Sequence, residues 1–297
     1  MLTSGRAAGI PPTIDRSSRP SGSGPDERNE AASAVPAVPH GAMRVAVISD
    51  IHANLPAFEA VLDAIERSEA EEIWCLGDLV GYGAQPDQCA DLARERCALT
   101  LVGNHDLAVL GELDISAFSS AAAEAAVWTA DNCEPQTLDY MRSLTPRGER
   151  EDIDLYHASP RDPVWEYVLS LEQAEACMKA HDRPIALIGH SHVALFFVRG
   201  GAFPGAIGGE ARSQDGVRGA QASDSARLDL GEGDWLINPG SVGQPRDGDP
   251  RAAWLELETE EGLGVYHRVP YDIDAAAGPI LDAGLPKHLA ERLYIGH

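Results

Sequence analysis

The chain has 297 residues, of which 47 are Asp or Glu and 23 are Lys or Arg, so its formal net charge is -24. This length is sufficient for one large domain or two small ones, with a core large enough for catalysis. Such acidity argues against binding nucleic acid or an anionic membrane through a basic surface. A phosphate substrate stays open, because bound metal ions supply positive charge locally.

Residues 1–42 differ in composition from the rest of the chain. They are rich in Ser, Pro, Gly and charged residues and show no periodic apolar pattern. Such a segment cannot bury enough apolar surface to offset the entropy lost on ordering. We therefore expect a disordered N-terminal tail at 1–42 and a folded domain at 43–297, for which Met43 could equally be the true start.

The cysteine pattern indicates a reducing compartment. The chain has five cysteines, an odd number, and no CxxC pair, which fits reduced thiols in a cytosolic protein. No apolar stretch reaches the length needed to span a bilayer, and the N-terminus lacks the apolar region of a secretory signal. We expect a cytoplasmic protein that does not associate with membranes.

The first part of the folded chain alternates strands with helices. Short apolar runs predict strands at 45–48, 72–76, 98–102, 153–156 and 185–188. Apolar residues at helical spacing predict helices at 55–68, 86–97 and 171–181, and a largely helical stretch from 107 to about 142. This alternation is typical of parallel β-α-β units.

The pattern changes after residue 192. Short alternating segments predict a second, largely antiparallel sheet. Its strands are expected at 194–198, 227–230, 235–238, 253–257 and 265–269. The glycine-rich stretch 200–225 is expected to be a mobile surface loop, and two short helices follow Asp272.

Polar residues follow five of the predicted strands. Asp50 and His52 come first, and side chains at i and i+2 of an extended backbone point to the same side. An oxygen donor and a nitrogen donor placed in this way could bind a metal ion. An Asp that caps the next helix, beside an incidental His, would give the same pattern. The other strand ends carry Asp78, Asn104, His105, His157, His190 and His192. Each residue is unremarkable alone. Polar residues at five consecutive strand ends nevertheless favour a functional site, because open α/β sheets bind their ligands at this edge.

These motifs together resemble the calcineurin-like metallophosphoesterase superfamily, most closely its small bacterial phosphodiesterases. The matching motifs are DIH at 50–52, GDLVGYG at 77–83, GNHD at 103–106, the solitary His157 and GHSH at 189–192. The likeness extends over about residues 43–270. It implies an α/β fold, a two-sheet β-sandwich of mixed strands flanked by helices, in four layers α/β/β/α.

The resemblance also implies two divalent metal ions bridged by the carboxylate of Asp78. One ion would be held by Asp50, His52, Asp78 and His192, and the other by Asp78, Asn104, His157 and His190. This mixed donor set suits Mn²⁺, which we expect, and also Fe²⁺, Zn²⁺ or Ni²⁺. A hydroxide between the two ions would attack phosphorus in line with the leaving oxygen.

His105 is expected to protonate the leaving group, with Asp106 or a neighbouring carbonyl fixing its tautomer; a structural hydrogen bond is the alternative role. Many members of the superfamily read GDxVDRG where this chain has 77–83, so an arginine that can hold substrate phosphate is absent. Arg161 and Arg246 are candidates to replace it, although both could be solvated loop residues. Tyr82 could stack on a base or aryl group, or simply pack.

The expected function is hydrolysis of small phosphodiesters or nucleotides by a metal-dependent phosphoric ester hydrolase. The alternatives are a protein phosphatase, a dinucleotide polyphosphate hydrolase or a non-catalytic metal-binding scaffold. The helical stretch 107–142 begins beside the site and could roof it, which would exclude a folded protein substrate. The expected partner is therefore a small phosphate ester, and no basic groove for a nucleic acid strand is evident.

Overall fold

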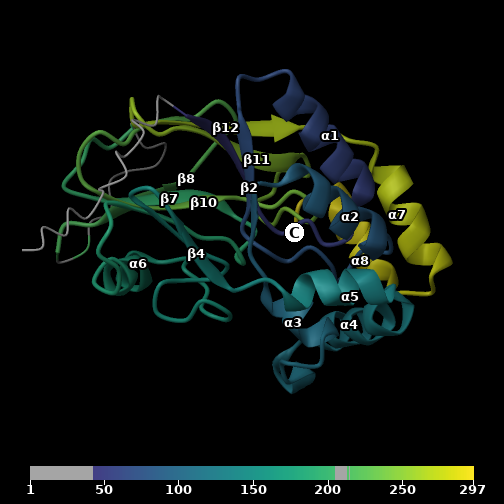
Figure 1. Cartoon of the computed structure of the whole chain (residues 1–297). Helices are drawn as coiled ribbons and strands as arrows, with labels where there is room; N and C mark the ends of the chain where they lie inside the picture. The colour runs from purple at the N-terminus through teal and green to yellow at the C-terminus, as the bar shows by residue number, and fades with distance from the viewer. Residues whose placement is uncertain (1–42, 205–212, 214) are drawn as a thin grey trace, which may run out of the picture. The chain divides into compact units, whose positions relative to one another are not determined.

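The computed structural model describes residues 43–204, 213 and 215–297. The predicted tail at 1–42 lies outside the described residues. Two mixed sheets of six strands form the centre of the described part, and helices lie outside them (Figure 1). This arrangement confirms the predicted α/β fold with a two-sheet sandwich of mixed strands.

The first sheet has the strand order β3-β2-β1-β11-β12-β9. Strands β1, β2 and β3 are parallel to one another, as the β-α-β pattern predicts, whereas β11 pairs antiparallel with the other edge of β1. The strands are β1 (Arg44–Ile48), β2 (Glu72–Cys75), β3 (Leu99–Thr100), β9 (Arg227–Asp229), β11 (Ala252–Glu258) and β12 (Leu263–Val269).

The second sheet has the order β4-β5-β6-β10-β7-β8. Here β5, β6 and β10 are parallel, and β4, β7 and β8 join antiparallel. The strands are β4 (Arg147–Arg150), β5 (Ile153–Tyr156), β6 (Ile185–Leu187), β7 (Ala194–Arg199), β8 (Arg218–Gln221) and β10 (Asp234–Pro239).

The prediction that the later strands form a sheet of their own is wrong. Strands β9, β11 and β12 join the first sheet, and β7, β8 and β10 join the second. Alternation shows which faces of a strand are buried, but not which sheet the strand enters. The loop predicted at 200–225 contains β8, while 205–212 and 214 lie outside the described residues. Strand β4 was not predicted, because its polar sequence lies on a sheet edge and shows no alternation.

The helices are α1 (Leu55–Glu66), α2 (Pro86–Arg96), α3 (Asn104–Val109), α4 (Ser120–Asn132), α5 (Pro135–Arg142), α6 (Leu171–Cys177), α7 (Ile273–Asp282) and α8 (Lys287–Glu291), with 3-10 turns η1 (Ile115–Ala117) and η2 (Arg292–Tyr294). In the described part of the chain, no helix combines the length and the apolar character needed to cross a membrane.

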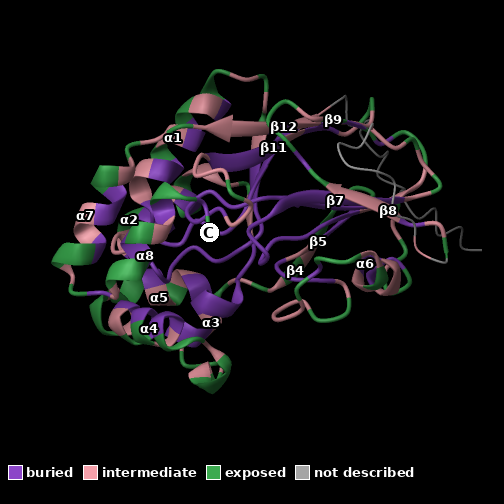
Figure 2. Cartoon of the chain, turned by 180° about the vertical axis from the view of Figure 1, so that it is seen from behind, coloured by how far each residue is buried: buried purple, intermediate pink, exposed green. Residues whose placement is uncertain are grey.

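The residues of β1 show how the layers form. Ala46 and Ile48 point to the helical side and belong to the core that includes Phe58 of α1. Val45 and Val47 point to the opposite side, into the apolar layer between the sheets. The second sheet buries its outer face against the α6 region, and buried residues line the centre of the domain (Figure 2). The order of layers is therefore helix, sheet, sheet, helix, as predicted.

Candidate metal centre and adjoining pocket

The strand ends have an unusual backbone conformation. The φ angles of Asp50, His52, Asp78, His190 and His192 lie between 51° and 64°. Left-handed φ is rare for residues with a Cβ, costs on the order of 1–3 kcal/mol per residue and concentrates at functional sites. The surrounding structure must hold these five residues in place, and all five are buried.

This backbone corrects the reasoning for the first pair. The prediction took Asp50 and His52 as neighbours on one face of an extended strand. Strand β1 ends at Ile48, and both residues lie in a turn with left-handed φ. The main-chain N–H of Asp50 donates to Gly77 O at 3.0 Å, and that of His52 donates to Asp78 O at 3.0 Å. The turn after β1 is therefore fixed on the turn after β2.

The structure brings the predicted ligands into two groups. Within each group one donor atom per residue lies within 4.8 Å of the others: Asp50, His52, Asp78 and His192 in the first, and Asp78, His157 and His190 in the second. Asp78 belongs to both groups, which is the arrangement that a bridging carboxylate requires. Asn104, the first residue of α3, places its Oδ1 3.1 Å from His157 Nε2.

Hydrogen bonds fix the tautomers of the first two histidines. Nδ1 of His52 lies 3.0 Å from Val80 O, and Nδ1 of His192 lies 2.7 Å from Gln244 O. A carbonyl oxygen only accepts, so each Nδ1 must carry the proton. Burial lowers the pKa of both rings well below the usual range, so both are neutral. Their Nε2 lone pairs then face each other at 3.0 Å, which is a repulsive contact unless a cation lies between them.

The outer hydrogen bond of His157 has the same geometry. Its Nδ1 donates to Leu76 O at 2.9 Å, so the neutral form of the ring has its lone pair on Nε2. That lone pair faces Asn104 Oδ1 at 3.1 Å, another acceptor. In metal sites, a ligating histidine usually donates its other ring N–H to a carbonyl or carboxylate. The three histidines therefore have the outer hydrogen bonds of ligands and no donor at their inner nitrogens.

The two carboxylates complete the pattern. Asp78 Oδ1 accepts from the His105 N–H at 2.9 Å. Asp78 Oδ2 has no hydrogen-bond partner in the described structure and lies 3.5 Å from His52 Nε2 and 3.7 Å from His157 Nε2. Asp50 Oδ2 accepts from the His190 N–H at 3.1 Å, and its Oδ1 is likewise without a hydrogen-bond partner among the residues described. Each buried carboxylate therefore has one oxygen without a hydrogen-bond partner in the described structure, and this oxygen faces the histidine nitrogens.

The pKa values agree with a cation site. Burial raises the pKa of Asp50 to about 7, and burial, followed by the charge of Asp106, raises the pKa of Asp78 well above its usual range. Carboxylates buried side by side are costly to ionise unless a positive charge accompanies them. Divalent cations supply that charge, and ligation requires deprotonated groups. The donors present therefore fit two divalent ions.

His105 and Asp106 do not interact as predicted. The two carboxylate oxygens of Asp106 accept from the Val80 N–H at 3.0 Å and the Gly103 N–H at 2.9 Å. Among the described residues, Nδ1 of His105 has no hydrogen-bond partner. The expectation that Asp106 or a carbonyl orients His105 is thus wrong, and Asp106 instead fixes the start of α3. The His105 ring is held by neighbouring rings, with centroids 4.3 Å from Tyr82 and 4.9 Å from Phe118.

A pocket of about 290 Å³ adjoins this cluster. Residues of helical segments and several aromatic side chains form its walls. The residues that line it are Tyr82, Asn104, His105, Ala117, Phe118, Ser119, Ala122, Trp165, Tyr167, Arg246 and Arg292. The stretch 107–142 supplies four of them, at η1 and the start of α4. This placement agrees with the predicted roof.

The structure separates the two candidate arginines. Arg246 lines the pocket, whereas Arg161 does not: it pairs with Glu166 at 3.5 Å, and its side chain is 46% exposed. Sequence reasoning missed Trp165, Tyr167 and Arg292. The two aromatic residues stand in a polar loop shortly after His157, which was a usable signal. Nothing in the local sequence of η2 indicates that Arg292 reaches the site.

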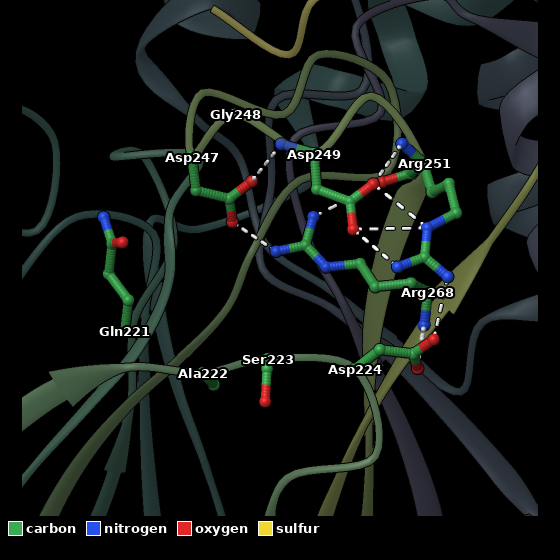
Figure 3. Close-up of a pocket in the computed structure, with 9 residues that line it drawn as sticks. All are labelled: Gln221, Ala222, Ser223, Asp224, Asp247, Gly248, Asp249, Arg251 and Arg268. Carbon is green, nitrogen blue, oxygen red and sulfur yellow. Dashed lines mark hydrogen bonds and ion pairs between the residues drawn. The ribbon is translucent and has the colours of Figure 1, made fainter. Parts of the chain in front are cut away.

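A second cavity, of about 520 Å³, is lined by charges that satisfy one another (Figure 3). Arg251 pairs with Asp249 at 2.7 Å and with Asp224 at 2.8 Å. Arg268 pairs with Asp247, and both side chains are nearly fully buried. These arginines already have carboxylate partners. The ion pairs that line this cavity therefore stabilise the loop after Arg246.

A mixed two-sheet sandwich with clustered Asp and His residues at its strand ends is the architecture of metallophosphoesterases. The model of the calcineurin-like phosphoesterase superfamily domain matches residues 43–260, and the chain belongs to this superfamily. An uncharacterized protein of Methanocaldococcus jannaschii, MJ0912, is 36% identical over 259 residues, which cover 85% of this chain and 98% of that protein.

Two solved structures share the fold. The crystal structure of a metallophosphoesterase from Sphaerobacter thermophilus has 37% identity and a TM-score of 0.74, covering 86% of this chain and 100% of that one. A hypothetical protein from Pyrococcus horikoshii OT3, PH1004, has 20% identity and a TM-score of 0.66, with 86% and 99% covered. The family resemblance of the motifs is thereby confirmed.

Gly103→Ala tests how tightly the centre is built. A Cβ at Gly103 would overlap the Asp78 carboxylate and lie within 2.6 Å of its Cγ. We expect a loss of about 1–3 kcal/mol in the free energy of unfolding and weaker metal binding, measured by urea denaturation and metal titration. Gly231→Ala is the matched control, because a Cβ there meets only Asp229 Oδ1, at 3.4 Å. Equal behaviour of the two variants would contradict the close packing of Asp78.

Asp78→Asn tests the shared carboxylate. Asn keeps an oxygen for the His105 N–H but removes the charge, so we expect the metal-free variant to melt no lower than the metal-free wild type. We also expect it to lose both ions, whereas His192→Ala loses mainly one. Elemental analysis after gel filtration and melting curves with and without Mn²⁺ measure this; saturating ligand stabilises by about 3 kcal/mol at a hundredfold excess over Kd. About two equivalents of metal retained by Asp78→Asn would contradict bridging.

Proposed function

We propose that this protein is a dinuclear metal-dependent phosphoesterase that hydrolyses small phosphodiesters or nucleotides. The observation that carries the proposal is Asp78 Oδ2, a buried oxygen without a hydrogen-bond partner in the described structure, set between the inner nitrogens of His52 and His157. Asn104 belongs both to this cluster and to the pocket lining. A phosphate bound in the pocket would therefore lie beside the metal centre.

The roles of the ligands follow from their donors. Two divalent ions, Mn²⁺ in our proposal and Fe²⁺, Zn²⁺ or Ni²⁺ otherwise, would supply Lewis-acid activation of water and neutralise phosphate charge. The residues Asp50, His52, Asp78, Asn104, His157, His190 and His192 would hold them. Asn104 is neutral, so it adds a donor without adding negative charge beside the phosphate.

His105 would hold a proton at the leaving oxygen. Burial and then the charge of Arg246 lower its pKa. A bound phosphate anion favours the imidazolium and moves that pKa upward. With no hydrogen bond to Nδ1 among the described residues, the ring is held mainly by Tyr82 and Phe118. Arg246 is half-buried beside Tyr82 and would bind the reacting phosphate. It would thereby replace the arginine that the superfamily motif has and this chain lacks.

The shape of the pocket favours a small substrate over a phosphoprotein. Phe118 and Ser119 of the roofing segment line it on one side, and Trp165 and Tyr167 on another. A volume near 290 Å³ suits a nucleotide-sized group, and aromatic side chains suit a base or aryl ring. A cytoplasmic location stays a prediction from the cysteine content.

Comparing substrates under one metal tests the proposed class. With Mn²⁺, we expect kcat/KM for bis(p-nitrophenyl) phosphate and 2′,3′-cyclic nucleotides to exceed that for a phosphoserine peptide by about tenfold or more. The physical reason is steric, since a peptide is bulkier than a nucleotide and the pocket is walled by Phe118, Trp165 and Tyr167. p-Nitrophenyl phosphate serves as the small monoester control. A peptide preferred by more than tenfold would overturn the small-substrate proposal, and no hydrolysis of any ester would favour the scaffold alternative.

His105→Ala tests the proton donor. An alkoxide needs a proton to leave, so we expect a loss of about 10²–10⁴-fold in kcat for an alkyl phosphodiester. A nitrophenolate leaves without one, so its loss should be clearly smaller. His288→Ala, an exposed histidine of α8, is the control and should change neither rate. Equal losses for both leaving groups would leave His105 with an electrostatic role only.

A further inference from the structure

Two arginines, Arg246 and Arg292, line the pocket. Arg246 donates to Gln244 Oε1 at 2.9 Å and to Tyr82 Oη at 3.3 Å, and its buried Nε is without a hydrogen-bond partner in the described chain. Arg292 donates from Nε to a carboxylate oxygen of His297, the last residue of the sequence. Neither forms an ion pair with an Asp or Glu side chain of the described residues. In a chain where acidic residues outnumber basic ones 47 to 23, two such guanidinium groups in one pocket indicate an anion site.

The two guanidinium groups lie at different depths. Arg246 lies next to the cluster, since its main-chain N–H donates to His192 O at 3.0 Å. Arg292 lies beside Arg246: burial, and then the charge of Arg246, lower its pKa. Both cations lie over the Tyr82 ring, at 5.6 Å and 6.0 Å from its centroid. The order along the pocket is therefore metal centre, Arg246, Arg292.

The position of Arg292 is built by packing. Helices α7 and α8 and the turn η2 share an apolar cluster with Tyr82 and with Ala125 of α4, in which Leu289 and Leu293 are buried. The Gly248 N–H donates to Gly296 O at 2.9 Å, which fixes the segment after η2 on the loop after Arg246. That loop is itself anchored by the buried pair of Asp247 and Arg268 (Figure 3).

We propose that Arg292 binds a second anionic group of the substrate, separate from the phosphate that reacts at the metal centre. The preferred substrate would then carry a second phosphate within reach of the first, with its base or aryl ring among Phe118, Trp165 and Tyr167. Arg292 is thus a specificity-determining residue, and it does not act on the reacting bond. This inference rests on the proposed function of the same site.

Matched esters separate the second anion from the reacting one. Thymidine 5′-(p-nitrophenyl phosphate) and its 3′-phosphorylated form differ only in the added phosphate, and both release nitrophenolate, which needs no proton donor. Metal-loaded full-length wild type, Arg292→Gln and Arg292→Lys are compared with Arg142→Gln. Arg142 is an exposed arginine of α5 paired with Asp139, so this control removes one positive charge away from the pocket. Melting curves check that every variant is folded.

A second readout does not depend on turnover. Calorimetry of the metal-loaded protein measures the binding of thymidine 5′-monophosphate, thymidine 5′-diphosphate and thymidine 3′,5′-bisphosphate. We expect Arg292→Gln to weaken at least one doubly phosphorylated ligand by about 10- to 100-fold, as for loss of a charged hydrogen bond, and the monophosphate by less than about threefold. We also expect Arg292→Lys to recover part of the loss and Arg142→Gln to show none.

The outcomes distinguish the two proposals. If neither ester is hydrolysed but the diphosphate or bisphosphate still binds in an Arg292-dependent way, the proposed reaction fails and the second anion site stands. If the esters are hydrolysed and Arg292→Gln weakens singly and doubly phosphorylated ligands equally, the site binds only one phosphate and the inference is overturned. Unchanged binding of all three ligands in Arg292→Gln would overturn it as well.

Discussion

The close approach of acceptor atoms around Asp78 is the constraint on which the site depends. His52 and His192 present lone pairs to each other at 3.0 Å, and Asp78 Oδ2 lies 3.5 Å from the first of them. Nothing among the described residues donates a proton into this group. A protein without a cation there would relieve the repulsion by rotating these side chains outward. The outer hydrogen bonds to Val80 and Gln244 oppose that rotation, so the fold holds the donors in a geometry that only bound cations make favourable.

Both sheets are needed to hold that geometry. Asp50, His52 and Asp78 follow β1 and β2 of the first sheet, whereas His157 and His190 follow β5 and β6 of the second. Main-chain bonds join the two sides, including Gly243 N–H to Asp50 O at 2.9 Å. The apolar layer between the sheets therefore sets the distance between the two donor groups. A mutation deep in that layer would act on metal binding without touching a ligand, because interiors are close-packed and transmit strain.

Sequence reasoning predicted the fold and the cluster of candidate donors for a physical reason. Parallel strands end at one edge, so donors that follow successive strands converge there, and all seven predicted ligands lie in the cluster or contact it. It failed where the answer depended on tertiary packing. The left-handed φ of His52, the pairing of Asp106 with main-chain N–H groups and the exposed position of Arg161 leave no local pattern. Arg292 lies 100 residues after His192 and reaches the pocket only because α7 and α8 pack on Tyr82.

The net charge of -24 and the proposed anion binding in the pocket are compatible because they act over different distances. Exposed charges are screened beyond about 8 Å at physiological ionic strength, so surface carboxylates mainly slow the approach of an anion. Inside the pocket, Arg246, Arg292 and the proposed divalent cations would dominate the local potential. A substrate short enough to lie wholly within that region gains their attraction. A polyanion that extended past the rim would meet the acidic surface along the rest of its length, so the charge distribution that favours the proposed small substrate would disfavour a nucleic acid strand.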